Sequence, residues 1–222
     1  MTEEFDLVVR GGTILDGTGR PEFRADIGIR DGTIAAIGNL RADTAEVIDA
    51  DGLLVTPGFV DIHTHYDGHV TWARHIEPSA THGVTTVVTG NCGVGFAPCR
   101  AQDHEVLISV MEGVEDIPEV VMAEGLPWNW ETFPEYLDVI GRRPHDVDIA
   151  AYVPHSALRV YVMGERGAAR EPATADDLAR MSQLMSEALD AGALGFATGS
   201  VPIHRTSAGD YKIGRASCRE RG

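Results

Sequence analysis

Short apolar runs broken by glycine and aspartate fill the first part of the chain. The Asp31-Gly32 pair separates two alternating runs, which is a strong signal for a β-hairpin. Gly11-Gly12 marks a second break of the same kind. The pattern predicts a small all-β layer over residues 1–56, with a turn at each pair. Its strand-like runs lie at residues 5–10, 13–15, 25–30, 33–37 and 46–48.

Buried strands alternate with helical stretches after Pro57-Gly58. This alternation is typical of a parallel α/β fold. A TIM barrel contains eight strand–helix units, and about four of them occur over residues 57–211, so we expect the first half of such a barrel. The strand-like segments are residues 59–63, 85–89, 147–153 and 194–198.

The clearest helix is expected over residues 174–191. Thr174 and Asp177 have the spacing of a capping box at its start, and Gly192 ends it. Apolar residues recur at helical spacing between these two ends. They are Leu178, Met181, Leu184 and Leu189.

The end of the chain differs in composition from the rest. Residues 212–222, KIGRASCRERG, contain four cationic side chains and one carboxylate, whereas the whole chain has a formal net charge of −16. Lys212 is the only lysine of the sequence. The segment resembles the in-frame translation of a sequencing adapter, and the alternative is an ordinary basic C-terminus. We expect a non-native tail here and leave it, with Cys218, out of the fold prediction.

Composition and charge narrow the class of protein. A chain that is 43% hydrophobic and 23% charged can fold around a sizeable core. Its negative net charge and scattered cations provide no basic surface for a nucleic-acid backbone. No apolar stretch approaches the roughly 20 residues of a membrane helix, and the acidic start is unlike a signal peptide. We therefore expect a cytoplasmic protein without a nucleic-acid or membrane partner.

Two histidines end the first predicted barrel strand. His63 and His65 alternate in GFVDIHTHYD, and the period of two in a strand places both imidazoles on one face. At the carboxyl end of a barrel strand this face looks into the mouth of the barrel, where imidazoles hold zinc at about 2.1 Å. The alternative is a pair of histidines that happen to alternate on an exposed strand end. Their position after a β layer, on a first barrel strand, favours a metal site.

Cys92 follows the next predicted strand, within GNCGVG. Neighbouring strands are about 4.8 Å apart, so its thiolate can reach ions that His63 and His65 hold. The flanking glycines allow close approach. The alternative is a small buried thiol. Three cysteines are too few for a disulfide framework, so each is expected to be a thiol with a packing or a metal-binding role. We predict that His63, His65 and Cys92 are metal ligands and that zinc is the cofactor.

Five segments carry a recognisable pattern: ADIGIRDGTIAAIG, VIDADGLLVTPGFVDIHTHYD, GVTTVVTGNCGVGFAP, VPHSALRVYVMG and GALGFATG. Together they resemble the amidohydrolase superfamily, in particular its D-aminoacylase branch, which includes N-acyl-D-amino-acid and N-acyl-D-glutamate deacylases. The resemblance covers nearly all of residues 5–211. The HxH pair marks only the superfamily, whereas GNCGVGFAP is much more specific to the branch. The resemblance implies zinc-dependent hydrolysis of the amide bond of a small-molecule N-acyl-D-amino acid.

The same resemblance implies an architecture and a division of ligand roles. A β-sandwich built from both chain ends flanks the TIM-like barrel, so residues 1–56 are expected to be the N-terminal part of that sandwich. Zinc is held tightly by Cys92 with two histidines from later strands, and His63 and His65 serve a second, weaker site. The general base is an aspartate on the last barrel strand, downstream of this chain. We therefore expect this chain to be an inactive, truncated part of the enzyme.

An absent lysine distinguishes between branches. Many amidohydrolases bridge two metals with a carboxylated lysine at the fourth barrel strand, but residues 194–198 have no lysine near them. A thiolate, which zinc favours, must then substitute, and Cys92 is the candidate because Cys99 lies in a loop after Pro98. This argues against a cyclic-amide hydrolase. A dipeptidase and a non-catalytic scaffold protein of the same fold remain as rivals.

Other residues near the predicted barrel mouth are candidates for secondary roles. His155 follows the third strand and either lines the substrate pocket or is structural. His204 and Arg205 follow the fourth strand, where they can meet a substrate carboxylate. Asp67 is expected to support the metal ligands by hydrogen bonding. An aromatic cluster is expected to be packing: Trp128, Trp130, Phe133 and Tyr136.

Overall fold

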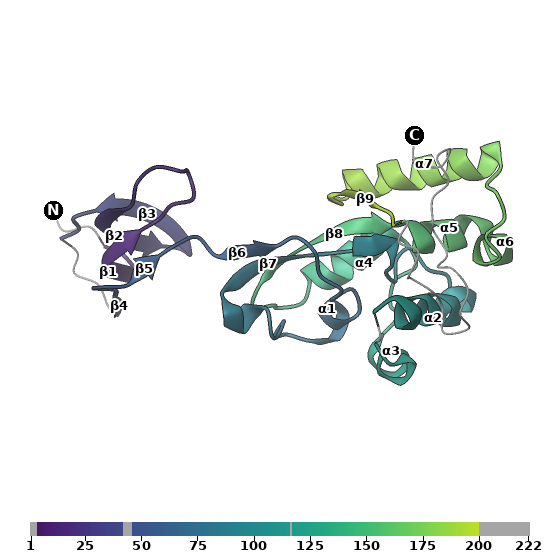
Figure 1. Cartoon of the computed structure of the whole chain (residues 1–222), viewed down its shortest axis with the longest axis horizontal. Helices are drawn as coiled ribbons and strands as arrows, with labels where there is room; N and C mark the ends of the chain where they lie inside the picture. The colour runs from purple at the N-terminus through teal and green to yellow at the C-terminus, as the bar shows by residue number, and fades with distance from the viewer. Residues whose placement is uncertain (1–3, 42–45, 116, 200–222) are drawn as a thin grey trace. The chain divides into compact units, whose positions relative to one another are not determined.

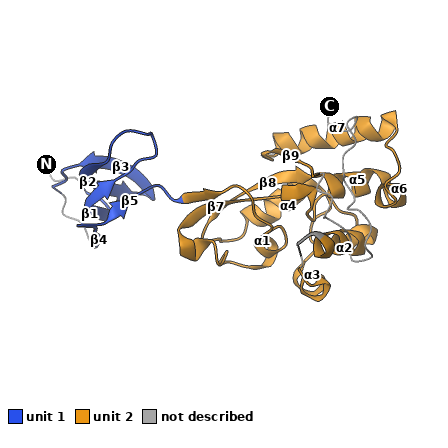
Figure 2. Cartoon of the chain, in the orientation of Figure 1, with its two compact units in different colours: residues 1–58 blue, residues 59–222 orange. Residues whose placement is uncertain are grey.

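The computed structural model describes residues 4–41, 46–115 and 117–199. The chain divides into two compact units, Met1–Gly58 and Phe59–Gly222, shown in Figure 2. His204, Arg205 and the predicted tail at residues 212–222 lie outside the described residues. Within the described ranges, no helix has the length and apolar character needed to cross a membrane.

The first unit contains one five-stranded sheet (Figure 1). Its central strand is β1 (Leu7–Ile14), which pairs antiparallel with β2 (Phe23–Arg30) and parallel with β4 (Glu46–Asp49) and β5 (Leu54–Val55). At one edge of the sheet, β3 (Thr33–Gly38) pairs antiparallel with β2. The all-β layer is therefore confirmed, whereas the sandwich, which needs a second sheet, stays a prediction. The buried apolar residues of this unit are Phe5, Val8, Ile14, Ile27 and Ala50.

The two predicted turns in this unit have different outcomes. Asp31 and Gly32 join β2 to β3 with φ of 51° and 70°, the left-handed values that a tight two-residue hairpin requires, so the hairpin is confirmed. The turn at Gly11-Gly12 is wrong, because β1 runs through it with a shift of register opposite β2. Gly11 has φ 71°, and a Cβ on Gly12 would lie 2.5 Å from Val55. These glycines serve a bulge and close packing instead of a chain reversal.

The second unit is built on four parallel strands that pair in chain order, a parallel half-barrel sheet (Figure 1). Helical segments connect each strand to the next, which confirms the predicted parallel α/β organisation. The strands are β6 (Phe59–Asp61), β7 (Val84–Thr89), β8 (Asp148–Pro154) and β9 (Gly195–Ala197).

The connections differ in length and helical content. β6 and β7 are joined through α1 (His69–Trp72) and η1 (Ala80–His82). β7 and β8 are joined through η2 (Asn91–Gly93), η3 (Ala101–Asp103), α2 (His104–Glu115), α3 (Glu119–Gly125) and α4 (Phe133–Gly141). β8 and β9 are joined through α5 (His155–Met163), α6 (Glu165–Ala168) and α7 (Ala175–Asp190). Side chains from strands and helices share one core, which includes Val87, Leu107, Met111, Val153 and Leu158.

Helix α7 begins at the predicted capping box. Thr174 Oγ1 accepts a hydrogen bond from the Asp177 backbone N–H (3.2 Å), and the Asp177 carboxylate accepts one from the Thr174 N–H (2.8 Å). Met181, Leu184 and Ala188 form its buried face. Leu178 and Leu189, near the two ends of the helix, are 37% and 49% exposed.

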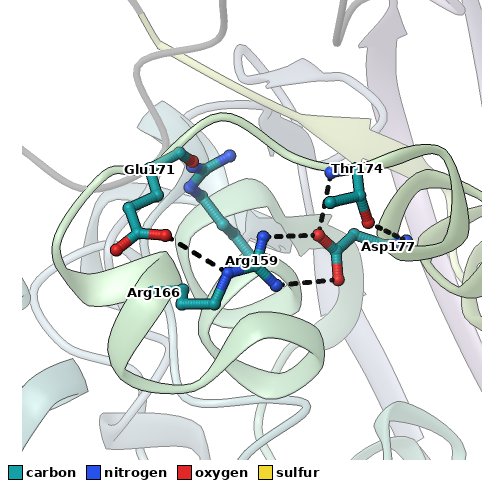
Figure 3. A network of polar contacts seen from close by, with 5 residues as sticks. All are labelled: Arg159, Arg166, Glu171, Thr174 and Asp177. Carbon is teal, nitrogen blue, oxygen red and sulfur yellow. Dashed lines mark hydrogen bonds and ion pairs between the residues drawn. The ribbon is translucent and has the colours of Figure 1, made fainter.

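A polar network ties the start of α7 to the preceding helices (Figure 3). The Arg166 guanidinium of α6 lies 3.0 Å from the Asp177 carboxylate and 3.2 Å from that of Glu171. Arg159 of α5, which is buried, donates to the backbone carbonyl of Glu171. Hydrogen bonds from Arg166 and then from Thr174 lower the pKa of Asp177 from its ordinary value of 3.8 to about 2.

The aromatic cluster packs as predicted. Trp130, Phe133 and Tyr136 are buried, and Trp130 Nε1 donates to the backbone carbonyl of Phe96 (2.8 Å). Trp128 is half-buried and stacks on the His104 ring, with the ring centroids 3.7 Å apart. Burial of Trp130, Phe133 and Tyr136, with the Trp130 indole N–H hydrogen-bonded, is what a packing role requires.

Candidate metal centre

The three predicted ligands lie in the loops that follow β6 and β7. β6 ends at Asp61, so His63 and His65 are in the loop and not on the strand itself, which corrects the predicted strand end. At this point the His63 N–H donates to Asp61 Oδ1 (3.3 Å), a local contact between an aspartate and the backbone two residues on that is typical of turns. The Thr64 N–H still donates to the carbonyl of Val88 on β7 (3.1 Å), which keeps the loop against the neighbouring strand.

These loops bring the three side chains together. One potential ligand atom from each of His63, His65 and Cys92 lies within 4.8 Å of the other two. Cys92 Sγ is 3.4 Å from His63 Nε2, and the His63 and His65 ring centroids are 5.5 Å apart. A tetrahedral zinc ion with bonds of about 2.1 Å to nitrogen and 2.3 Å to sulfur places these two donors about 3.6 Å apart. The residues present therefore fit a zinc ion in both donor type and spacing.

The two described cysteines have different environments. Cys92 is half-buried, whereas Cys99 is 1% exposed. Burial raises the pKa of the Cys99 thiol to about 12, with smaller contributions from Asp103 and Glu131. Because the thiolate is the metal-binding form, Cys92 is the available sulfur ligand among the described residues.

The backbone around Cys92 is left-handed. Gly90, Cys92 and Gly93 have φ of 82°, 53° and 70°. For a non-glycine residue this conformation costs on the order of 1–3 kcal/mol and persists only where the surroundings enforce it. A Cβ on Gly90 would lie 2.2 Å from the carbonyl oxygen of Tyr152, so glycine is required for the turn to lie against β8.

Buried polar side chains surround this turn. Asp67 Oδ1 accepts from the Gly90 N–H (2.7 Å), and the Tyr136 hydroxyl donates to the backbone carbonyl of Asp67 (2.8 Å). The Asn91 side-chain amide donates to the carbonyl of Val88 (2.8 Å). Asp67 therefore acts on the turn that carries Cys92, through the backbone of Gly90.

Ser156 and Asn91 were missed by the sequence-based reasoning. The Ser156 hydroxyl is fully buried and donates to the carbonyl of Gly93 (2.6 Å). Each of the two residues directly adjoins a predicted site residue, Cys92 or His155. Their position next to a predicted site residue was the available signal. Sequence position alone does not show which polar neighbours of a site residue have buried side chains.

His155 lies at the junction of β8 and α5. It is 2% exposed, its Nδ1 is 3.0 Å from Thr198 Oγ1, and its ring meets Phe196 edge-on at 5.2 Å between centroids. The residue therefore links the ends of β8 and β9. Its role in substrate binding stays a prediction, as do those of His204 and Arg205, which lie outside the described residues.

Known proteins resemble this chain over most of its length. It is 39% identical over 200 residues to the D-aminoacylase of Alcaligenes xylosoxydans xylosoxydans, an alignment that covers 90% of this chain and 38% of that protein. A solved structure of D-aminoacylase, which concerns the functional role of its binuclear metal center, matches this chain with a TM-score of 0.76 and 37% identity. The match covers 97% of this chain and 41% of the other.

A second solved structure is similar to the same extent. It is the N-acyl-D-glutamate deacylase of Bordetella bronchiseptica, complexed with zinc and a phosphonate inhibitor. The TM-score is 0.74 at 33% identity, covering 98% of this chain and 41% of the other. This chain thus spans about two fifths of the length of these relatives. The model of the Amidohydrolase family matches residues 46–215, and the chain belongs to this family.

Proposed function

We propose that the whole protein containing this chain is a zinc-dependent hydrolase that cleaves the amide bond of N-acyl-D-amino acids, releasing a carboxylate and a D-amino acid. The observation that carries the proposal is the Cys92 thiol 3.4 Å from the His63 imidazole, in a cluster completed by His65. The relatives named D-aminoacylase and N-acyl-D-glutamate deacylase support the substrate class. The chain spans about two fifths of their length, so the activity is a property of the whole protein.

His63, His65 and Cys92 are the residues of this chain that would hold zinc. A binuclear centre, as in the D-aminoacylase relative, requires ligands beyond these three, and we assign them to the rest of the protein. In that arrangement Cys92 would be a ligand of the tighter site, and from its position beside His63 its thiolate would also reach the weaker site that His63 and His65 hold. Bound zinc supplies a Lewis acid that polarises the amide carbonyl and acidifies water.

The remaining side chains of this chain position the ligands or the substrate. Asp67 is buried and hydrogen-bonded to Gly90, which is consistent with holding the Cys92 turn. We assign the general base to an aspartate downstream. Arg205 and His204 are proposed to meet the substrate carboxylate, because guanidinium groups bind carboxylates in a bidentate manner. His155 is proposed to shape the same pocket from the end of β8.

A cyclic-amide hydrolase with a lysine-bridged metal pair is the less favoured function. Such a bridge needs a lysine at the fourth barrel strand, and the only lysine of the sequence is Lys212. The soft donor set of one thiol and two imidazoles also suits zinc without a carboxylate bridge.

We also propose that the five-stranded sheet of the first unit is one layer of a β-sandwich. Several of its apolar side chains are exposed, including Ile34 at 63% and Leu54 at 64%. A packed second sheet would bury such side chains. The proposed domain limits are residues 1–56 for this layer and 57–211 for the barrel half.

The function is tested with the full-length protein and matched enantiomers of one N-acetyl amino acid. We expect carboxylate release from the D-enantiomer and much less from the L-enantiomer, with activity lost after zinc is removed and regained when zinc is restored. Equal or reversed preference would contradict the substrate class while leaving the zinc proposal intact. Full activity in metal-free protein would contradict the zinc proposal.

A further inference from the structure

The turn at residues 90–93 is clamped from both sides. On one side the Gly90 N–H donates to Asp67 Oδ1 at 2.7 Å, from the loop after β6. On the other side the Ser156 hydroxyl donates to the Gly93 carbonyl at 2.6 Å, from the first turn of α5. Asp67 is 2% exposed and Ser156 is 0% exposed, so water does not compete for either hydrogen bond. The turn after β7 is thus tied to the segments that follow both neighbouring strands.

Cys92 lies between the two clamped ends in a backbone conformation that is unfavourable for a residue with a side chain. Its φ of 53° and ψ of 4° lie in the left-handed region, which side-chain-bearing residues rarely occupy. Gly90 and Gly93 on either side bring large backbone freedom, so local sequence does not favour this geometry. In this conformation Cys92 Sγ lies 3.4 Å from His63 Nε2.

We propose that Ser156 and Asp67 are positioning residues for Cys92, which fix the turn so that the thiol faces His63 and His65 before a metal ion binds. Ser156 acts through the Gly93 carbonyl and Asp67 acts through the Gly90 N–H. The consequence for zinc rests on the proposed function, whereas the fixing of the turn does not. Pre-organised ligands bind a metal more tightly because less ordering is needed on binding.

The fixing of the turn is tested by hydrogen exchange in the metal-free, full-length protein. Ser156→Ala removes the donor to Gly93 and should speed amide exchange over residues 90–94 by about tenfold or more. The control is Tyr161→Phe, on the same helix, which removes a hydroxyl that donates to Glu131 (3.0 Å) and leaves the turn untouched. Exchange over residues 90–94 should match the wild type in this control.

The consequence for the metal is tested by zinc affinity, measured by competition with a chelator. Ser156→Ala and Asp67→Ala should each weaken zinc binding by about 10- to 100-fold. Asp67→Asn keeps an oxygen acceptor for the Gly90 N–H, so it should restore most of the affinity. Cobalt-substituted protein should lose intensity in its thiolate charge-transfer band in the alanine variants and keep it in Asp67→Asn.

The two measurements separate this proposal from the proposed function. If amide exchange over residues 90–94 in Ser156→Ala stays at the wild-type rate, the positioning role is overturned. This holds even if the variant unfolds at a lower temperature. Faster exchange with unchanged zinc affinity, in a protein whose zinc depends on Cys92, would also overturn it. If Cys92→Ala leaves zinc binding unchanged, the proposed metal role fails, and the exchange result alone decides whether the clamp exists.

Discussion

Cys92 Sγ lies 3.4 Å from His63 Nε2, although the two residues are 29 positions apart in the sequence. Parallel pairing of β6 with β7 places Asp61 opposite Val87, so the carboxyl ends of the two strands lie side by side. A thiol and an imidazole from two separate loops then meet. The proximity of these two potential metal ligands is therefore a direct consequence of strand order.

Replacement of Cys92 should remove tightly held zinc from the full-length protein. Cys92→Ala deletes the available thiolate ligand, whereas His63→Ala or His65→Ala should empty only the weaker site. Zinc content per protein after dialysis against a chelator measures both. Cys99→Ala is the matched control, because that buried thiol has a pKa of about 12 and should not contribute a ligand. Full zinc content and unchanged activity in Cys92→Ala would make Cys92 a packing residue.

Gly90→Ala should be strongly destabilising in the full-length protein. The position has φ 82°, and the new Cβ would lie 2.2 Å from the Tyr152 carbonyl oxygen, so β8 or the turn must move. We expect a loss of at least about 2 kcal/mol in the free energy of unfolding, measured by denaturant titration. Gly141→Ala, where nothing lies within 4 Å of the new Cβ, should be neutral or stabilising by up to about 1 kcal/mol. Similar values for the two variants would contradict the close approach.

Acid should weaken the start of α7. The folded-state pKa of Asp177 is lowered from 3.8 to about 2, so its ionised form is favoured in the folded protein. This contribution to stability is present above about pH 4 and is lost as the pH falls from about 4 toward 2. Asp177→Asn should lower the unfolding temperature at neutral pH. The variant's unfolding temperature should also decrease less than that of the wild type between about pH 4 and pH 2. Asp176→Asn, an exposed neighbour in the same helical turn, is the control and should retain the wild-type pH profile.

Residues 1–211 expressed alone should be inactive and prone to aggregation. The edge strand β6 and its loop expose Phe59, Val60 and Ile62 at 63%, 57% and 70%, and β9 at the other edge exposes Phe196 at 37%. Apolar side chains at unpaired strand edges favour association between chains. Thermal unfolding by circular dichroism and an amidase assay with added zinc test this expectation. A soluble segment with a sharp transition and zinc-dependent activity would show that residues 1–211 contain a complete catalytic set.

Local chemistry was enough to predict several elements. Asp31-Gly32 forms its hairpin because both residues tolerate a left-handed backbone, and Thr174 with Asp177 caps α7 because the two hydrogen bonds span a single helical turn. The alternation of strands and helices after Gly58 likewise predicted the parallel sheet. For the hairpin and the helix cap, the determining interactions lie within a few residues of one another, so the linear pattern contains them. The parallel sheet was predicted from the order of elements along the chain, because parallel strands need a crossover connection between them.

Other features depended on which strands pair. Gly11-Gly12 has the local signature of a turn, and only its packing against β2 and Val55 makes it a bulge. The sequence by itself pointed to Cys92 as a ligand, from its place after a strand and from the lack of a nearby lysine. The clamps on its turn join residues 23 and 63 positions apart, Asp67 with Gly90 and Ser156 with Gly93. The tertiary structure alone decided them, because no local preference specifies a hydrogen bond between loops of neighbouring strands.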